Sequence, residues 1–135
     1  MYHSERAFTL IELLIVMAIM ALSLSLVLPL TVDQVESARK RAEREKVVLF
    51  LRQATQNAFY YSEPVNVTVS GKRLTADYQN REQAVLETTY LTFEEQKFVL
   101  FALGPSIPTT LTAVISGNRW PLEVSREKIT WLNPD

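Results

Sequence analysis

A long apolar run near the N-terminus constrains this chain more than any other feature. The 23 residues from Phe8 to Leu30 contain one charged side chain, that of Glu12. At about 1.5 Å per residue, a helix of this length reaches about 34 Å, against a hydrocarbon core of roughly 30 Å in a bilayer. A charge at the centre of such a span costs roughly 2.5 to 3.5 kcal/mol, so it is normally kept for a partner or a function. The sequence predicts a transmembrane helix in which Glu12 needs a specific explanation.

The helical pattern continues beyond the apolar run but changes character. Neither glycine nor proline occurs between Asp33 and Ser62, so we expect the helix to reach about Tyr61. Apolar residues then follow at spacings of four, three, four and three, which places them on one face of a helix. They are Val47, Leu51, Ala54, Ala58 and Tyr61, with Phe50 broadening the stripe. We expect this stripe to pack on a sheet, and a groove for a partner helix is the alternative.

Pro29 lies in the middle of the predicted helix. A proline removes one helical donor and crowds the carbonyl four residues back, here that of Ser25. We expect a kink or local melting at this point. It is either a bend where the chain leaves the membrane or a flexible joint that lets the helix stretch in a filament.

The remainder of the chain reads as short strands. Val65, Val67 and Val69 alternate with polar residues, which indicates a half-buried strand that turns at Ser70 to Arg73. Further strands are predicted over 74–78, 85–93, 97–103, 111–115, 120–124 and 129–132, with a turn at 94–96 and a break at 104–108. Strands that follow one long helix predict an α+β fold, with an antiparallel sheet packed on the helix.

The segment Arg6-Ala7-Phe8-Thr9-Leu10-Ile11-Glu12 resembles the N-terminus of type IV prepilins and of the pseudopilins of type II secretion systems. The resemblance extends from Arg6 to about Leu30. Phe8 takes the place of the first residue after the cleavage site, and Glu12 that of the fifth. Pro29 lies where long pilin helices often carry a proline. The family normally has glycine before the cut, and Ala7 departs from this pattern, which leaves slower cleavage as an expectation.

The resemblance implies how the chain is processed and divided. A prepilin peptidase would cut between Ala7 and Phe8 on the cytoplasmic side and methylate the new amine of Phe8. Residues 1–7 would be the leader, 8–30 a transmembrane and assembly helix, and 31–135 a periplasmic pilin-like domain. The implied location is the bacterial inner membrane, with a single pass and a cytoplasmic N-terminus.

The resemblance also implies partners. These are other pilins or pseudopilins in a filament and an inner-membrane assembly platform. Glu12 would pair with the amine of a neighbouring Phe8 and set the axial register of adjoining subunits. The alternative is that Glu12 pairs with its own amine, one helical turn away.

Two observations on the N-terminus favour other interpretations. Ala21-Leu22-Ser23 weakly imitates the cleavage site of a secretory signal, but 23 apolar residues is too long for such a signal and Glu12 would stay unexplained. The positive-inside rule would place the N-terminus outside, because Arg6 precedes the span and five basic residues follow it. These five alternate with acids and lie beyond the first turns after the membrane: Arg39, Lys40, Arg41, Arg44 and Lys46. We therefore follow the resemblance.

The composition supplies no catalytic constellation. The chain has no cysteine and one histidine, His3, which lies in the predicted leader. The mature chain would therefore lack a thiolate nucleophile and an imidazole for a triad or a zinc site, and we expect neither enzyme activity nor a cofactor. Trp120 and Trp131 could stack on a ligand, but we expect them to pack within the domain.

The charge balance argues against nucleic acid as a partner. Residues 62–135 carry seven Lys or Arg and nine Asp or Glu, a net charge of −2. Such a domain has no overall field that would attract a polyanion. Its basic residues are scattered along the sequence.

The globular part that follows the membrane helix, called the head, is short, has no disulfide and ends in an all-β tail. In these features it is most similar to the H-type minor pseudopilins of type II secretion. We therefore predict a structural subunit of a pseudopilus that helps to export folded proteins. The alternative is a minor type IV pilin, which starts pilus assembly or takes up DNA. A membrane-anchored enzyme or receptor is a third class, which no predicted site supports.

Overall fold

The computed structural model describes residues 8–125 and 127–134. They form one helix and one antiparallel sheet of seven strands in the order β3-β2-β1-β4-β5-β6-β7. The elements are α1 (Leu10–Tyr61), β1 (Val65–Gly71), β2 (Arg73–Asp77), β3 (Ala84–Glu87), β4 (Leu91–Leu100), β5 (Thr110–Ile115), β6 (Asn118–Val124) and β7 (Ile129–Trp131). This confirms the predicted α+β, pilin-like arrangement.

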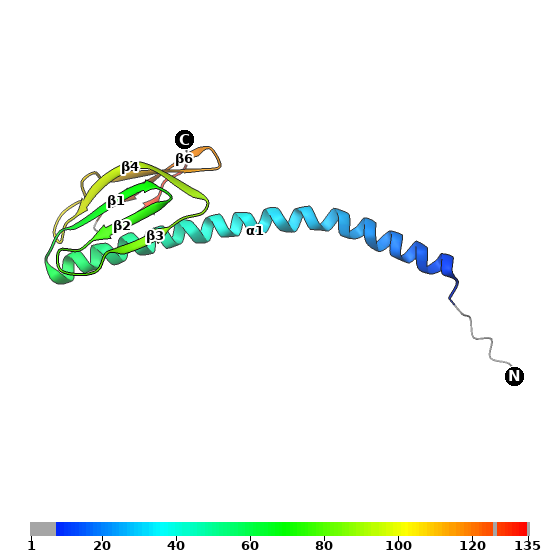
Figure 1. Cartoon of the computed structure of the whole chain (residues 1–135). Coiled ribbons are helices and arrows are strands. Elements are labelled where there is room, and N and C mark those ends of the chain that lie inside the picture. Colours follow the sequence, from blue (N-terminus) through cyan, green and yellow to red (C-terminus); the bar gives the residue numbers. More distant parts are fainter. Residues whose placement is uncertain (1–7, 126, 135) are drawn as a thin grey trace. The chain divides into compact units, whose positions relative to one another are not determined.

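The chain divides into two compact units, the first ending at Ala38 and the second running from Arg39 to Asp135. In the second unit, the end of α1 packs against the sheet, as Figure 1 shows. The first unit consists, within the described residues, of the start of α1 and the two residues before it.

Both ends of α1 are capped by recognisable local motifs. Thr9 precedes the helix, and its backbone oxygen accepts hydrogen bonds from the N–H groups of Glu12 and Leu13. At the other end, Ser62 has a left-handed φ of 54°. The N–H of Ser62 donates to the Phe59 carbonyl and that of Glu63 to the Ala58 carbonyl, the bonding pattern of a Schellman cap. The cap explains why α1 ends at Tyr61, as predicted.

The core of the second unit lies between α1 and one face of the sheet. Four residues of the predicted helix stripe, Val47, Leu51, Ala54 and Ala58, have no exposed surface. The fifth residue, Tyr61, is 47% exposed and is not part of the core. The sheet supplies Val65, Val67, Val69, Leu74, Leu91, Phe93, Phe98, Leu100, Leu111, Leu122 and Val124, among others. The stripe therefore packs on the sheet of its own chain.

The first predicted hairpin is confirmed. β1 and β2 pair with Val69 opposite Leu74 and Ser70 opposite Arg73, which leaves a two-residue loop. Gly71 begins that loop with a φ of 56°, a left-handed conformation that glycine adopts without a steric cost. The alternation of buried and exposed residues in β1 follows the predicted period of two.

The predicted strands 85–93 and 97–103 are wrong in their boundaries. The break lies at residues 88–90 instead, and β4 runs without interruption through the predicted turn at 94–96. Gly71 pairs with Phe93 and Val69 with Gln96, so β4 has one extra residue between these two pairs. This is a β-bulge, and it leaves Glu94 and Glu95 both exposed.

The bulge accounts for the error. Phe93 and Phe98 are five positions apart, so a regular strand would place them on opposite faces. The extra residue restores the phase, and both side chains are buried. Two adjacent glutamates that look like a turn in the sequence are therefore part of a bulged strand.

Candidate assembly site

The predicted processing and assembly residues lie at the start of the described chain. Ala7 lies outside the described residues, so the junction is seen only from Phe8 onward. Phe8 is 76% exposed and precedes the helix, which begins at Leu10 rather than at Phe8.

Glu12 occupies the first turn of α1 and is exposed. Its backbone N–H lies 3.4 Å from the hydroxyl oxygen of Thr9. Threonine before a helix, followed three residues later by glutamate, is the sequence arrangement of a capping box. A carboxylate in the first turn also interacts favourably with the helix dipole. Glu12 thus fits the helix start locally, and it is exposed.

The following helix presents a largely apolar surface. The large apolar residues that the structure describes between Phe8 and Val35 are exposed, including Leu10 at 81% and Leu26 at 74%. The most apolar 18-residue window has a mean hydropathy of 2.7, and none of it is buried within the protein. By length and composition this helix can cross a membrane. Its apolar surface needs a cover that its own chain does not supply.

Pro29 is exposed, and α1 is continuous on both sides of it. The helix therefore does not show the expected local melting at Pro29. The kink and its use as a joint in a filament stay predictions.

Comparison with known proteins finds a family match for the N-terminal segment. Residues 2–28 match the family described as the prokaryotic N-terminal methylation motif. The N-terminal segment therefore carries a prepilin-type methylation motif. No curated protein and no solved structure matches the chain. The motif implies processing by a prepilin peptidase and assembly with other pilins, and together with the apolar helix it fits the membrane anchoring of a pilin.

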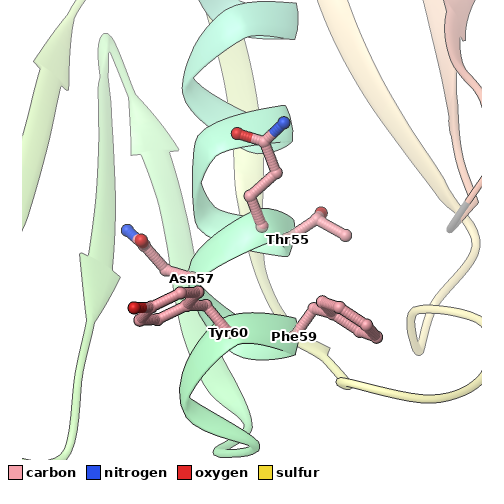
Figure 2. A pocket seen from close by; sticks show the side chains of 5 residues that line it. Thr55, Asn57, Phe59 and Tyr60 are labelled. Atoms are coloured by element: carbon pink, nitrogen blue, oxygen red, sulfur yellow. The ribbon is translucent and has the colours of Figure 1, made fainter.

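The head offers hollows but no group of catalytic residues. The first hollow, of about 570 Å³, is lined by residues of α1 alone, and Figure 2 shows Thr55 and Phe59 on one side of the ribbon and Asn57 and Tyr60 on the other. The Thr55 hydroxyl donates to the Leu51 carbonyl, and the Asn57 amide donates to the Tyr78 hydroxyl. Among the described residues no three potential metal ligands cluster. This hollow therefore lacks a nucleophile, a general base or a ligand set.

The two tryptophans are partly buried and pack within the second unit. The Arg44 guanidinium lies 4.5 Å from the ring centre of Trp120. The Trp131 indole N–H donates to the backbone oxygen of Arg44 over 3.2 Å. Both rings thus contact one turn of α1, which agrees with the predicted packing role.

Sequence reasoning missed the role of Glu43. Its carboxylate accepts hydrogen bonds from the N–H groups of Thr89, Tyr90 and Leu91 at 2.5, 2.7 and 3.0 Å. Thr89 and Tyr90 belong to the turn between β3 and β4, and Leu91 is the first residue of β4. The sequence placed all three inside one strand. Glu43 therefore fastens α1 to this turn.

Proposed function

We propose that this protein is a minor pseudopilin, a structural subunit of a type II secretion pseudopilus that helps to export folded proteins. The observation that carries the proposal is the exposed apolar helix that begins within a prepilin-type motif and contains Glu12 as its one charge up to Leu30. A helix of this kind is stable only when lipid or other subunits cover it. Lipid covers the helix while the subunit is in the membrane, and other subunits cover it once it is in the filament.

In this proposal the prepilin peptidase cuts between Ala7 and Phe8 and methylates the Phe8 amine. The helix then spans the inner membrane, with its N-terminus in the cytoplasm and the head in the periplasm. Other pseudopilins and the assembly platform are the partners. In this proposal the protein has a structural role and is not an enzyme.

The processing step has a direct test. Intact-mass or N-terminal peptide analysis of membrane-extracted protein should give a chain that begins at Phe8 and carries one additional methyl group on its amine. Protein from a strain that lacks the peptidase is the control and should begin at residue 1. A terminus after Ser23 or Ser25 would contradict the pilin interpretation, because the apolar run would then be a discarded signal.

A minor type IV pilin is the second candidate, favoured by the same motif. The two functions differ in the cellular defect that follows loss of the protein. A deletion strain should retain folded cargo in the periplasm if the protein serves secretion. Lost piliation or DNA uptake with normal secretion would favour the type IV pilin. The neighbouring genes distinguish the two functions with less effort. Secretion genes would favour the pseudopilin, and pilus genes would favour the type IV pilin.

A further inference from the structure

A groove in the second unit lies between α1 and the last strand of the sheet. It has a volume of about 460 Å³. Its lining residues are Arg41, Arg44, Glu45 and Val48 with Arg52 from α1, and Ile129, Thr130 and Trp131 from β7. No function discussed above uses this groove.

One wall of the groove is an open sheet edge. β7 is the last strand in the sheet order, and its pairs are with β6. The Leu132 N–H donates to the Pro121 carbonyl, and the Lys128 carbonyl accepts from the Ser125 N–H. The backbone groups of even-numbered residues here therefore point toward β6.

In an antiparallel ladder, alternate residues direct their N–H and C=O groups to opposite sides. The backbone groups of Ile129 and Trp131 consequently point away from β6. Such an edge can pair with one more strand.

The other wall is a row of arginines. Arg41, Arg44 and Arg52 are three and eight residues apart, which places them on one face of α1. Among the described lining residues, Glu45 is the single acidic one. Arg44 is held over Trp120, whereas the side chains of Arg41 and Arg52 are exposed.

The row of arginines has the length of a short extended segment, whereas β7 itself has three residues. From Arg41 to Arg52 the helix rises about 16 Å. An extended segment of about five residues covers the same distance. Its alternate side chains would face one side, so carboxylates at every second position could reach the row of arginines.

We propose that this groove is a strand-addition site for an extended acidic segment of another polypeptide. The main chain of that segment pairs with the outward backbone groups of Ile129 and Trp131, and its carboxylates lie along Arg41 and Arg52. Charge complementarity selects the occupant, because an open edge alone accepts any extended chain. The groove does not depend on processing or on Glu12. The strand-addition proposal can therefore be wrong while the proposed function is right, and the proposed function can be wrong while the strand-addition proposal is right.

The test uses the full chain in detergent and a dye-labelled peptide of alternating Glu and Thr, seven residues long, with binding followed by fluorescence anisotropy. We expect saturable binding that weakens as salt rises. Because both exposed ion pairs are lost, Arg41→Gln with Arg52→Gln should weaken binding several-fold, by up to about thirtyfold. Arg39→Gln with Lys46→Gln is the matched control, removes the same charge outside the lining, and should retain most of the affinity.

A second peptide separates strand pairing from simple charge attraction. The same sequence with N-methyl groups on alternate backbone nitrogens keeps every carboxylate but cannot donate to the sheet edge. It should bind at least several-fold more weakly. Unchanged thermal unfolding of each variant shows that the fold is intact.

Four results would overturn the proposal. They are equal binding of a Lys-Thr peptide, no effect of the arginine substitutions, equal binding of the N-methylated peptide, and tighter binding of a single-stranded oligonucleotide than of the peptide. Self-association of the full chain that is lost in the Arg41 and Arg52 variant would assign the groove to a second copy instead.

Discussion

Glu43 shows how one side chain can set the position of a helix on its sheet. Its carboxylate is half-buried and accepts three backbone hydrogen bonds from residues 46 to 48 positions away. Hydrogen bonds to a charged group contribute about 1.5 to 3 kcal/mol, more than those between neutral groups. In the sequence, Glu43 is one of several acids among basic neighbours, and nothing local distinguishes it from the exposed Glu45.

Glu43→Ala should lower the free energy of unfolding of the head by about 1.5 to 3 kcal/mol, because three N–H groups lose their acceptor. The measurement is urea unfolding of residues 31–135, which we expect to fold alone. Glu45→Ala, on the same helix but exposed, should change stability by less than about 0.5 kcal/mol. Equal effects of the two substitutions would show that the hydrogen bonds to residues 89–91 contribute little.

Glu12 is a second single residue with a specific role. Whereas Glu43 stabilises the fold, we expect Glu12 to act in assembly. Glu12→Leu makes the span more apolar, so cleavage and membrane insertion should be retained while incorporation into the filament falls. The physical reason is that a carboxylate among apolar helices needs a cationic partner, and we expect the Phe8 amine of an adjoining subunit to be that partner.

Crosslinking of the Glu12→Leu variant to partner pseudopilins measures incorporation. Leu13→Ala is a suitable control, because it keeps the charge and changes a neighbouring exposed side chain. Undiminished crosslinking of the Glu12 variant would exclude Glu12 as the residue that sets register.

At the scale of elements, the sequence predicted what depends on local pattern. The helix end, the buried stripe and the first hairpin follow from spacing, capping and glycine geometry, and the structure confirms them. The β3 and β4 boundaries were wrong because the bulge opposite Val69 and Gly71 is a property of strand pairing. Residues paired across a sheet are distant in sequence, so a period count along one strand cannot reveal the extra residue.

The stripe of α1 allows a quantitative test of packing. Leu51 is fully buried between α1 and the sheet. Leu51→Ala should lower the free energy of unfolding by about 2 to 5 kcal/mol, through lost burial and a residual cavity. Thermal or urea unfolding of residues 31–135 measures it. Leu49→Ala, at a site that is 57% exposed, should have a much smaller effect. Similar losses at the two sites would contradict packing of the stripe on the sheet.

For the molecule as a whole, charge limits the choice of partners. Residues 62–135 have a net charge of −2, and two of their basic side chains pair with acids: Arg73 with Glu87 at 2.6 Å and Arg119 with Glu94 at 3.2 Å. Three of the six basic residues of α1 line one groove. The sequence did not indicate this groove, because three of its eight lining residues come from β7, about 80 residues later in the chain.

We therefore expect the full chain to bind duplex DNA weakly and with strong salt dependence. Fluorescence anisotropy at physiological salt with two unrelated duplexes should show no preference between them. Tight binding that is lost on Arg119→Gln would favour the DNA-uptake pilin instead. The chain with Lys97→Gln, another exposed basic residue of the sheet, serves as the control.

The position of Val47 has an evolutionary consequence. Among the described side chains of α1, none before Val47 is buried, whereas four of the next eleven positions have no exposed surface or nearly none. Selection on the exposed apolar residues up to Val35 then cannot come from packing in the chain's own core, whereas selection on the part from Val47 onward can. The two parts can diverge at different rates, and recombination between them exchanges the anchor while the head is inherited intact.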